Sequence, residues 1–480
     1  MPREIGTVLV EDRAAAGTAS VYRSILSRLG TTGADRFGTV LVVLNFVMLF
    51  LRPQNDISII GTIRLPLILS IFGALVWLTR VGRTWTTQTR LLMLFLIVET
   101  VRTLLGKLVF DGLVRNDRWS FNTLADLYIQ FTGLIFPLVV FCNNIRGVRT
   151  LVRTWLFVSI YLAVYVIMHG GFGPGGFLGD ENDAGLVLLM FLPLPLAYLT
   201  EGGVSAGRKL LLFVSAVLVL AAITITLSRG AFVGMVIVIT YFFYRSRNKF
   251  KLLIAASLLF VCVLPFVPEQ YAEEIRSIQD TASGTAQTRR HFWKIATRVW
   301  LDPRHFIQGV GLANTPYHFG DYERPEDVVD GPSIAGRAVH SIYFQLLPDL
   351  GLWGIFIVGG IVLSSFRSNK RLGRQVDRLM HVSRLRLREQ DGSKGEDTER
   401  DHALVATVLR ELQFLRPLFL ATNLAFVAVL GAGMFVSALY YPPLWLLAGI
   451  SALLSLYWER LRDPLEEQLE STKRAAEASA

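Results

Sequence analysis

The fold is decided by "LLLFVSAVLVLAAITITLSRGAFVGMVIVITYFFY", residues 210–244. Two apolar runs flank the polar pair Ser228 and Arg229. A helix needs roughly 20 mostly apolar residues to span a bilayer, and fewer where neighbours shield its ends. The whole chain shares this character, since 52% of its residues are hydrophobic and 18% are charged, against roughly 25% charged in a soluble domain. We therefore predict an all-α, polytopic membrane protein.

Twelve apolar segments are predicted to span the membrane. They lie near 37–51, 65–79, 91–110, 121–142, 151–168, 184–200, 210–227, 230–244, 251–267, 342–365, 418–436 and 443–458. The first 36 residues are polar and mixed in charge, so we expect no signal peptide.

The connections between these segments alternate in their content of Lys and Arg. Five arginines precede the first segment, whereas the connection 169–183 has no basic residue. This positive-inside pattern predicts that both termini are cytoplasmic, together with the N-terminal segment 1–36, the basic connection 366–417 and the tail 459–480. It leaves one large loop, 268–341, on the outer face.

The predicted organisation is nine spans over 37–267, the outer loop 268–341, a tenth span over 342–365 and, after the basic connection, two spans over 418–458. The outer loop contains eight Lys and Arg residues, which long external segments tolerate. Because long structured loops often carry function, we expect catalysis in this loop.

Several classes of function lack their signals. Cys142 and Cys262 lie inside apolar runs, so neither a disulfide framework nor a thiolate metal site is expected. No phosphate-cradling GxxxxGK[ST], HExxH or GxSxG motif occurs. The net charge of +10 is explained by basic loops at a membrane surface, without nucleic acid.

Arg229 is predicted at the outer mouth of the bundle. An ionisable group at membrane depth usually faces a protein interior or a water-filled cavity, although an arginine also snorkels to the lipid headgroups. The small neighbours Gly230, Ala231 and Gly234 favour close approach of a backbone or a ligand. We therefore predict that a helix start here holds an anion.

Two further groups accompany Arg229. In "TAQTRRHFWK", residues 285–294, helical spacing puts Arg290 and Lys294 on one face and Arg289 with Trp293 on another. The alternative is a solvated basic face. His340 comes just before the tenth span and is a candidate proton acceptor, or a polar helix cap.

An acidic stretch, "DENDAG" at 180–185, opens the sixth predicted span. Its acids favour a helix N-terminus. They would also suit a divalent cation, but they are adjacent and not spaced around a loop. We expect Asp180 and Asn182 to contribute to substrate binding, and we expect no metal or cofactor.

The motifs together resemble the O-antigen ligase and polymerase superfamily. The resemblance rests on "SRGA", the Arg…Trp segment, "GVGLAN" at 309–314 and "HSIYFQLLPDLGLWG" from His340, and it covers roughly 180–365. Ser341 stands where the family usually has Asn. Two arginines, Arg289 and Arg290, stand where one is expected, with Arg289 better spaced to Trp293.

The resemblance implies transfer of a glycan from an undecaprenyl diphosphate carrier to a hydroxyl at the periplasmic face of a bacterial inner membrane. The implied catalytic residues are Arg229, Arg289, Arg290 and His340. Guanidinium groups are multidentate donors for phosphate, so the transfer is expected to need no metal. Direct attack of the hydroxyl on the anomeric carbon predicts inversion at that carbon. Trp293, Lys294, Tyr317 and His318 are candidate substrate contacts, with packing inside the loop as the alternative for Trp293, Tyr317 and His318.

The acceptor is left open by the sequence. We favour a ligase acting on the lipid A-core over a polymerase or a protein O-glycosylase. A polysaccharide or lipid transporter is the alternative from another class, since polar residues such as Glu99, Arg102 and Asp126 lie inside predicted spans.

Overall fold

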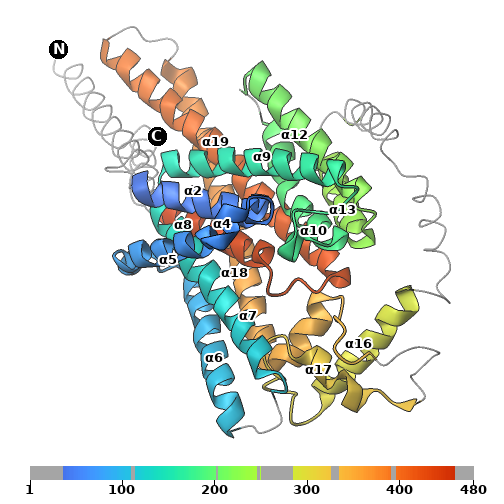
Figure 1. The fold of residues 1–480 in the computed structure, drawn as a ribbon. Helices are drawn as coiled ribbons and strands as arrows, with labels where there is room; N and C mark the ends of the chain where they lie inside the picture. The colour runs from blue at the N-terminus through green and yellow to red at the C-terminus, as the bar shows by residue number, and fades with distance from the viewer. Residues whose placement is uncertain are drawn as a thin grey trace, which may run out of the picture.

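The computed structural model describes residues 36–109, 114–201, 204–245, 249, 285–325, 334–390 and 396–459. Every regular element in those ranges is helical, as the apolar pattern predicts (Figure 1). The helices are α2 (Arg36–Leu51), α3 (Pro53–Asp56), α4 (Ser58–Thr62), α5 (Leu65–Leu78), α6 (Thr87–Val109), α7 (Asp117–Gln130), α8 (Phe136–Phe141), α9 (Ile145–Met168), α10 (Glu181–Phe191), α11 (Pro193–Leu199), α12 (Ala206–Ile225), α13 (Arg229–Arg245), α16 (Thr285–Leu301), α17 (Thr315–Tyr322), α18 (Ile342–Gln390) and α19 (Glu396–Ala432). A last described helix covers 442–459.

Six of the described helices are long and apolar enough to cross a membrane. They run over Asp117–Phe141, Ile145–Met168, Glu181–Leu199, Ala206–Ile225, Ile342–Leu385 and His402–Phe435. Three shorter apolar helices, Arg36–Leu51, Leu65–Leu78 and Arg229–Tyr244, coincide with predicted segments. The predicted segment 251–267 lies outside the described residues. The total of twelve spans therefore stays a prediction.

Two of the predicted spans consist of more than one helical piece. A π-helical turn, Phe131–Ile135, joins α7 to α8 just before Pro137. Proline has no N–H to donate to the preceding turn, so a local widening of the helix there is expected. In the same way Pro193 separates α10 from α11.

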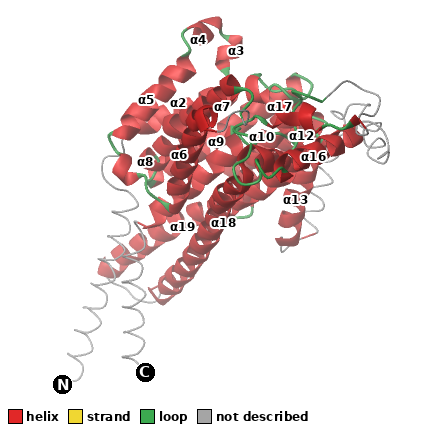
Figure 2. Cartoon of the chain, turned by 90° about the horizontal axis from the view of Figure 1, so that it is seen from below, coloured by secondary structure: helices red, strands yellow, loops and turns green. Residues whose placement is uncertain are grey.

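The basic connection 366–417 is helical wherever the structure describes it. The helix that starts the tenth predicted span continues as α18 to Gln390, and α19 begins at Glu396. The two helices pack side by side, and their joined ends project away from α16 and α17 (Figures 1 and 2). Leu372, Val376 and Leu379 are buried along this extension, so an apolar stripe continues among the charges.

The predicted outer loop has its own small hydrophobic core. Helices α16 and α17 and the chain near 334–339 contribute to it. Its buried members are Phe292, Ile295, Ala296, Val299, Val310, Phe319, Ile334 and Val339. Four of them, Phe292, Ile295, Ala296 and Val299, recur at helical spacing along α16. They define the face of α16 that packs on the core, and therefore also the opposite face that points away from it.

A break in α18 joins this loop to the helical bundle. Gly351 has φ +63°, a left-handed conformation, and a Cβ there would overlap the carbonyl oxygen of Ile307. The break frees backbone carbonyls in α18, and the loop uses them. Val310 donates to the carbonyl of Pro348 at 2.8 Å, and Gly311 donates to that of Asp349 at 3.0 Å. The motif "GVGLAN" is therefore part of a joint between the loop and α18.

Side chains reinforce the joint. The buried carboxylate of Asp349 accepts from the Thr315 N–H at 2.9 Å and from the Tyr440 hydroxyl at 3.0 Å. Arg102 of α6 donates to the Gln308 and Asp349 carbonyls. These contacts connect α6, α17, α18 and the segment after α19, so the loop is held at one position on the bundle.

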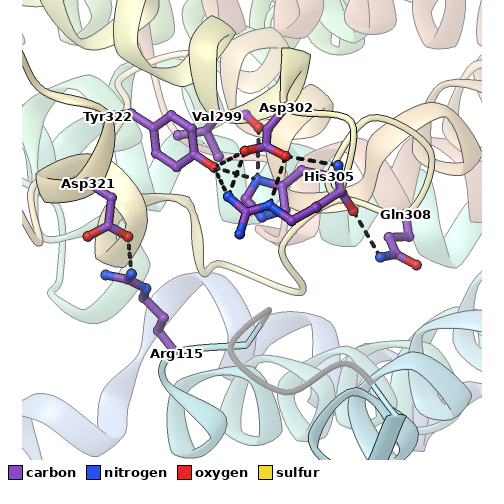
Figure 3. Close-up of polar contacts among 8 residues, drawn as sticks. Arg115, Val299, Asp302, His305, Gln308, Asp321 and Tyr322 are labelled. Carbon is purple, nitrogen blue, oxygen red and sulfur yellow. Dashed lines mark hydrogen bonds and ion pairs between the residues drawn. The ribbon is translucent and has the colours of Figure 1, made fainter.

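A second polar cluster stiffens the turn after α16 (Figure 3). Asp302 accepts from the Arg304 guanidinium at 2.8 and 3.0 Å and from the Tyr322 hydroxyl at 2.6 Å. The Arg304 hydrogen bonds hold the pKa of Asp302 well below its usual range. Arg115 forms an ion pair with Asp321 of α17. This cluster therefore ties the turn to α17, and the segment before α7 to the same helix.

Candidate active site

The start of α13 is tied to the start of α10. Ser228 caps α13, because its hydroxyl oxygen accepts from the Ala231 N–H at 3.3 Å. The same hydroxyl donates to Oδ1 of Asn182 at 2.9 Å. Asp180 caps α10 and accepts from both nitrogens of Asn182, at 2.8 and 3.0 Å. Two helix N-termini, each with partial positive charge, thus lie together.

Arg229 is the first residue of α13, as predicted for a helix start. The small residues after it allow close packing between helices. A Cβ on Gly230 would lie 3.0 Å from the Ala432 carbonyl oxygen, and one on Gly234 would overlap Leu189. The close approach to these small residues, which the sequence predicts, is therefore made by helices α19 and α10. This packing fixes the start of α13 and with it the position of Arg229.

Arg289 of α16 lies within electrostatic reach of Arg229. Burial lowers the pKa of Arg289 most, the positive charge of Arg229 lowers it further, and the negative charge of Asp180 raises it. The two guanidinium groups lie on separate helices and repel each other, and the negative charge of Asp180 acts on Arg289. Such an arrangement is suited to an anion that balances both guanidinium groups.

His340 belongs to the same group. Its pKa is lowered by burial first, then by the charge of Arg289 and, more weakly, by that of Arg337, while Asp180 raises it. The imidazole is therefore neutral at pH 7, the form that accepts a proton. Residues from α10, α13, α16 and the segment before α18 thus meet at one end of the bundle.

The backbone conformation and two contacts fix the position of the His340 ring. His340 has φ +55°, and its N–H donates to the Ser437 hydroxyl at 2.7 Å. The ring stacks against Phe292 of the loop core at a centroid separation of 6.1 Å. Ser341 is fully buried, and its carbonyl accepts from the Gln345 N–H at 3.0 Å. Ser341 therefore lies buried directly before α18, and the His340 ring next to it lies against the loop core.

Trp293 and Arg289 share an aromatic neighbour. The Trp293 ring stacks on Phe344 at 5.0 Å and lies 6.4 Å from Phe435. The Arg289 guanidinium carbon lies 6.0 Å from the centre of the Phe435 ring. Trp293 thus packs from α16 against α18 and against the turn after α19. Its contact with Phe435 supports the position of Arg289.

Arg290 and Lys294 lie on another face of α16. Both are exposed, whereas Arg289 is half-buried. The apolar residues that face the loop core set this rotation, because Phe292 and Ala296 point inward. Arg290 is thus one residue away from Arg289 in sequence but on a different side of the helix.

Tyr317 and His318 take opposite orientations on α17. Tyr317 is partly exposed and lines the cavity described next. His318 is 2% exposed, and its ring lies 5.3 Å from that of His305 in the loop. His318 therefore packs inside the loop, the alternative that the sequence left open.

A cavity of about 690 Å³ lies next to His340: its lining includes Val339, the residue before His340, and Ser437, whose hydroxyl accepts from the His340 N–H, but not Arg229, Arg289 or His340 itself. We call it the central cavity. Helices α2, α5 and α7 line it on one side, and α17, the chain before His340 and the segment 437–442 line it on the other. Its lining includes Arg52, Trp119, Gln130, Tyr317, Ser437 and Tyr441. Sequence reasoning missed it, because no single segment supplies more than a fraction of the wall.

Arg52 is the cation that the sequence did not single out. It follows α2 directly, lies against Phe177 with 5.5 Å between the guanidinium carbon and the ring centre, and would clash with any side chain at Gly176. Its Nε is buried without a hydrogen-bond partner among the described residues. Burial lowers the pKa of Arg52. A cation just after an apolar run, in "LFLRPQND", was the available signal.

No group of three or more His, Cys, Asp or Glu side chains suited to a metal occurs within the described ranges. Of the acids at the start of α10, Asp180 is used in capping and in the hydrogen bonds to Asn182.

Residues 214–359 match a family model described as O-antigen ligase. The chain carries an O-antigen ligase domain. This match supports membership of the O-antigen ligase superfamily, whose members are glycosyltransferase-like enzymes. The matched segment includes Arg229, Arg289 and His340, whereas Asp180 and Arg52 lie before it. The apolar helices agree with a membrane location. Among curated proteins, no sequence matches this chain.

Proposed function

We propose that the chain transfers a glycan from undecaprenyl diphosphate to an acceptor hydroxyl at the periplasmic face of the inner membrane. The observation that carries the proposal is the meeting of Arg229, Arg289 and His340 beside the central cavity. Two guanidinium groups match the charge and geometry of a diphosphate. A neutral imidazole next to them is suited to accept the proton of an incoming alcohol.

The chemistry follows from these positions. The acceptor oxygen attacks the anomeric carbon of the glycan as the bond from that carbon to the diphosphate oxygen breaks. His340 takes the acceptor's proton, and the carrier diphosphate leaves with the bonding electrons. Arg229 and Arg289 stabilise the negative charge that grows on the leaving group, and such donors contribute most where water is excluded. Direct displacement inverts the configuration at the anomeric carbon and needs no metal.

The central cavity is the proposed space for the sugars and the acceptor. Trp119, Tyr317 and Tyr441 are aromatic residues in its wall, and aromatic faces commonly support sugar rings. Arg52 adds a cation to the lining of the cavity. Asp180 and Asn182 act indirectly, because they hold the start of α13 and adjust the charge at His340.

Reconstitution tests the proposal. Purified protein in liposomes with a defined lipid-linked glycan and an acceptor should release undecaprenyl diphosphate and form an inverted glycosidic bond. His340→Ala should lower the rate by about 10²–10⁴, and Arg229→Ala by about 10²–10³. Near wild-type transfer by either variant would exclude its assigned role. Movement of the substrate across sealed vesicles without a new bond would indicate a transporter instead.

We propose the lipid A-core as the acceptor, with another carrier-linked repeat or a protein hydroxyl as the alternatives. A deletion strain separates the first two. Loss of a ligase leaves polymer on the carrier and bare core, whereas loss of a polymerase leaves single repeats attached to core. A protein glycosylase would be recognised by transfer to a Ser- or Thr-containing peptide in the reconstituted system.

A further inference from the structure

A second pocket, of about 540 Å³, lies at the other end of the helices. Helices α9, α12 and α19 form most of it, and each of them runs from this pocket toward the candidate active site. α12 ends at Ile225, four residues before Arg229, and the end of α19 packs on Gly230. The 20 residues of α12 correspond to about 30 Å, the thickness of a bilayer's hydrocarbon core. The two sites are therefore at opposite membrane boundaries.

The three helices line this pocket with the same order of side chains. Arg149 and Arg153 precede Leu156 on α9, Arg208 precedes Leu211 and Leu212 on α12, and Arg410 precedes Phe414 on α19. Because all three helices run in one direction, each puts its cation at the mouth and its apolar side chain deeper in the membrane. The pocket thus changes from charged to apolar along the membrane normal.

Acids neutralise only some of these cations. Arg149 pairs with Glu411 at 2.6 Å, and Glu201 in the pocket wall pairs with Arg416 at 2.9 Å. Arg153, Arg208 and Arg410 are exposed, and none of the acids in the described ranges forms an ion pair with them. We call these three residues the rim arginines. Among the described residues, no acidic side chain neutralises their positive charge.

The deeper wall faces lipid. Leu211 is 50% exposed although it is a leucine inside a membrane-spanning helix, while Val152 and Leu212 form a buried floor. Tyr198 offers no free donor there, since its hydroxyl already donates to the Phe414 carbonyl at 2.8 Å. The apolar part of the pocket is thus suited to a hydrocarbon chain and not to a sugar.

We propose that this pocket binds an anionic phospholipid, with the phosphate between the rim arginines and the first part of an acyl chain along Leu156 and Leu211. Guanidinium groups bind phosphate oxygens through several hydrogen bonds at once, and basic pockets between membrane helices bind anionic headgroups. The lipid anchors α9, α12 and α19, three helices whose far ends position the candidate active site. The inference is independent of the proposed reaction.

Native mass spectrometry of the full-length protein tests the proposal. The probes are phosphatidylglycerol and phosphatidylcholine with identical acyl chains. R153Q/R208Q/R410Q removes the rim arginines, and R371Q/R374Q/R378Q removes the same charge from exposed positions on α18. We expect wild type to prefer phosphatidylglycerol. Each rim arginine should contribute about five-fold, so the first triple variant should lose about 100-fold in affinity, and the control should lose less than two-fold.

Two outcomes would overturn the assignment. Equal affinity for phosphatidylglycerol in wild type and in the rim variant would show that these arginines hold no lipid. Competition by glycerol 1-phosphate or inorganic phosphate at the same concentration as the lipid would indicate a soluble anion. If the triple variant does not fold, R208Q alone should still bind phosphatidylglycerol about five-fold more weakly, and unchanged binding by R208Q would count against the proposal in the same way.

Discussion

Arginines gather at both ends of the helical bundle, and the two groups are held differently. At the candidate active site, Arg229 and Arg289 lie on separate helices and repel each other, and Asp180 acts on Arg289. Close packing at Gly230 fixes Arg229, and Arg289 lies against the Phe435 ring. At the opposite end the rim arginines are exposed at the mouth of a lipid-facing pocket. Fixed, mutually repelling cations indicate an anion held in one place for reaction. Exposed cations over an apolar wall indicate a mobile headgroup.

The largest effect should distinguish Arg289 from its neighbour Arg290. Arg289→Ala removes a proposed donor to the leaving diphosphate and should lower kcat/KM by about 10²–10³. Arg290→Ala, on another face of α16, should change it less than about three-fold, since exposed charges contribute little. Steady-state assays with a defined lipid-linked glycan measure both. A larger loss in Arg290→Ala would reverse the assignment.

A smaller effect is expected at Arg52. Arg52→Gln removes a cation from the central cavity but leaves Arg229, Arg289 and His340 in place. We expect KM for one substrate to rise about ten-fold, which corresponds to roughly 1.4 kcal/mol of binding, with kcat nearly unchanged. Arg64→Gln is the control, because Arg64 is exposed and lies outside the cavity. A fall in kcat with constant KM would place Arg52 at the reacting atoms.

The acid side of the pH profile tests the electrostatics at His340. Its pKa lies below the usual value, so kcat/KM should fall only as pH drops through that lowered pKa. Arg337→Gln removes a repelling charge, so the pKa should rise and the acid limb should move to higher pH. Asp180→Asn keeps a capping side chain and removes a favourable charge, so the limb should move to lower pH. Each shift should be within about one unit.

Shifts of the same sign in Arg337→Gln and Asp180→Asn would contradict this account of His340. An acid limb that neither substitution moves would point to a different titrating group.

The smallest effect concerns stability at the other end of the bundle. Arg149→Gln breaks the pair with Glu411, which is partly exposed on the arginine side. We expect the free energy of unfolding to fall by no more than about 1 kcal/mol, with transfer activity unchanged. Denaturation in detergent measures the first, and the reconstituted assay measures the second. Loss of activity at full stability would mean that this pair affects the active site.

Hydropathy alone was sufficient to locate the six described helices that are long and apolar enough to cross a membrane, because each contains an apolar run of the required length. It was not sufficient to predict where α18 ends. The stripe of Leu372, Val376 and Leu379 that continues the helix is diluted by arginines and lysines. Basic content suggested only a connection, whereas a periodicity of 3.6 residues in the same stretch would have indicated a helix.

The candidate site was predictable in part. A cation at a helix start and a histidine before another helix are local features, and the sequence shows both. The choice between Arg289 and Arg290 depends on the rotation of α16, for which Phe292, Ile295 and Ala296 were the signal. The central cavity forms where segments distant in sequence meet, and a single sequence does not show which distant segments are in contact. His318 is adjacent to Tyr317 yet turns into the loop core, because consecutive helical residues point in different directions.

The most direct test is the affinity of the purified protein for undecaprenyl diphosphate itself, measured without any acceptor. Wild type and Arg149→Gln should bind it equally, whereas Arg229→Ala and Arg289→Ala should each bind at least ten-fold more weakly, about 1.4 kcal/mol or more. Equal affinity in all four proteins would contradict the claim that Arg229 and Arg289 hold the diphosphate.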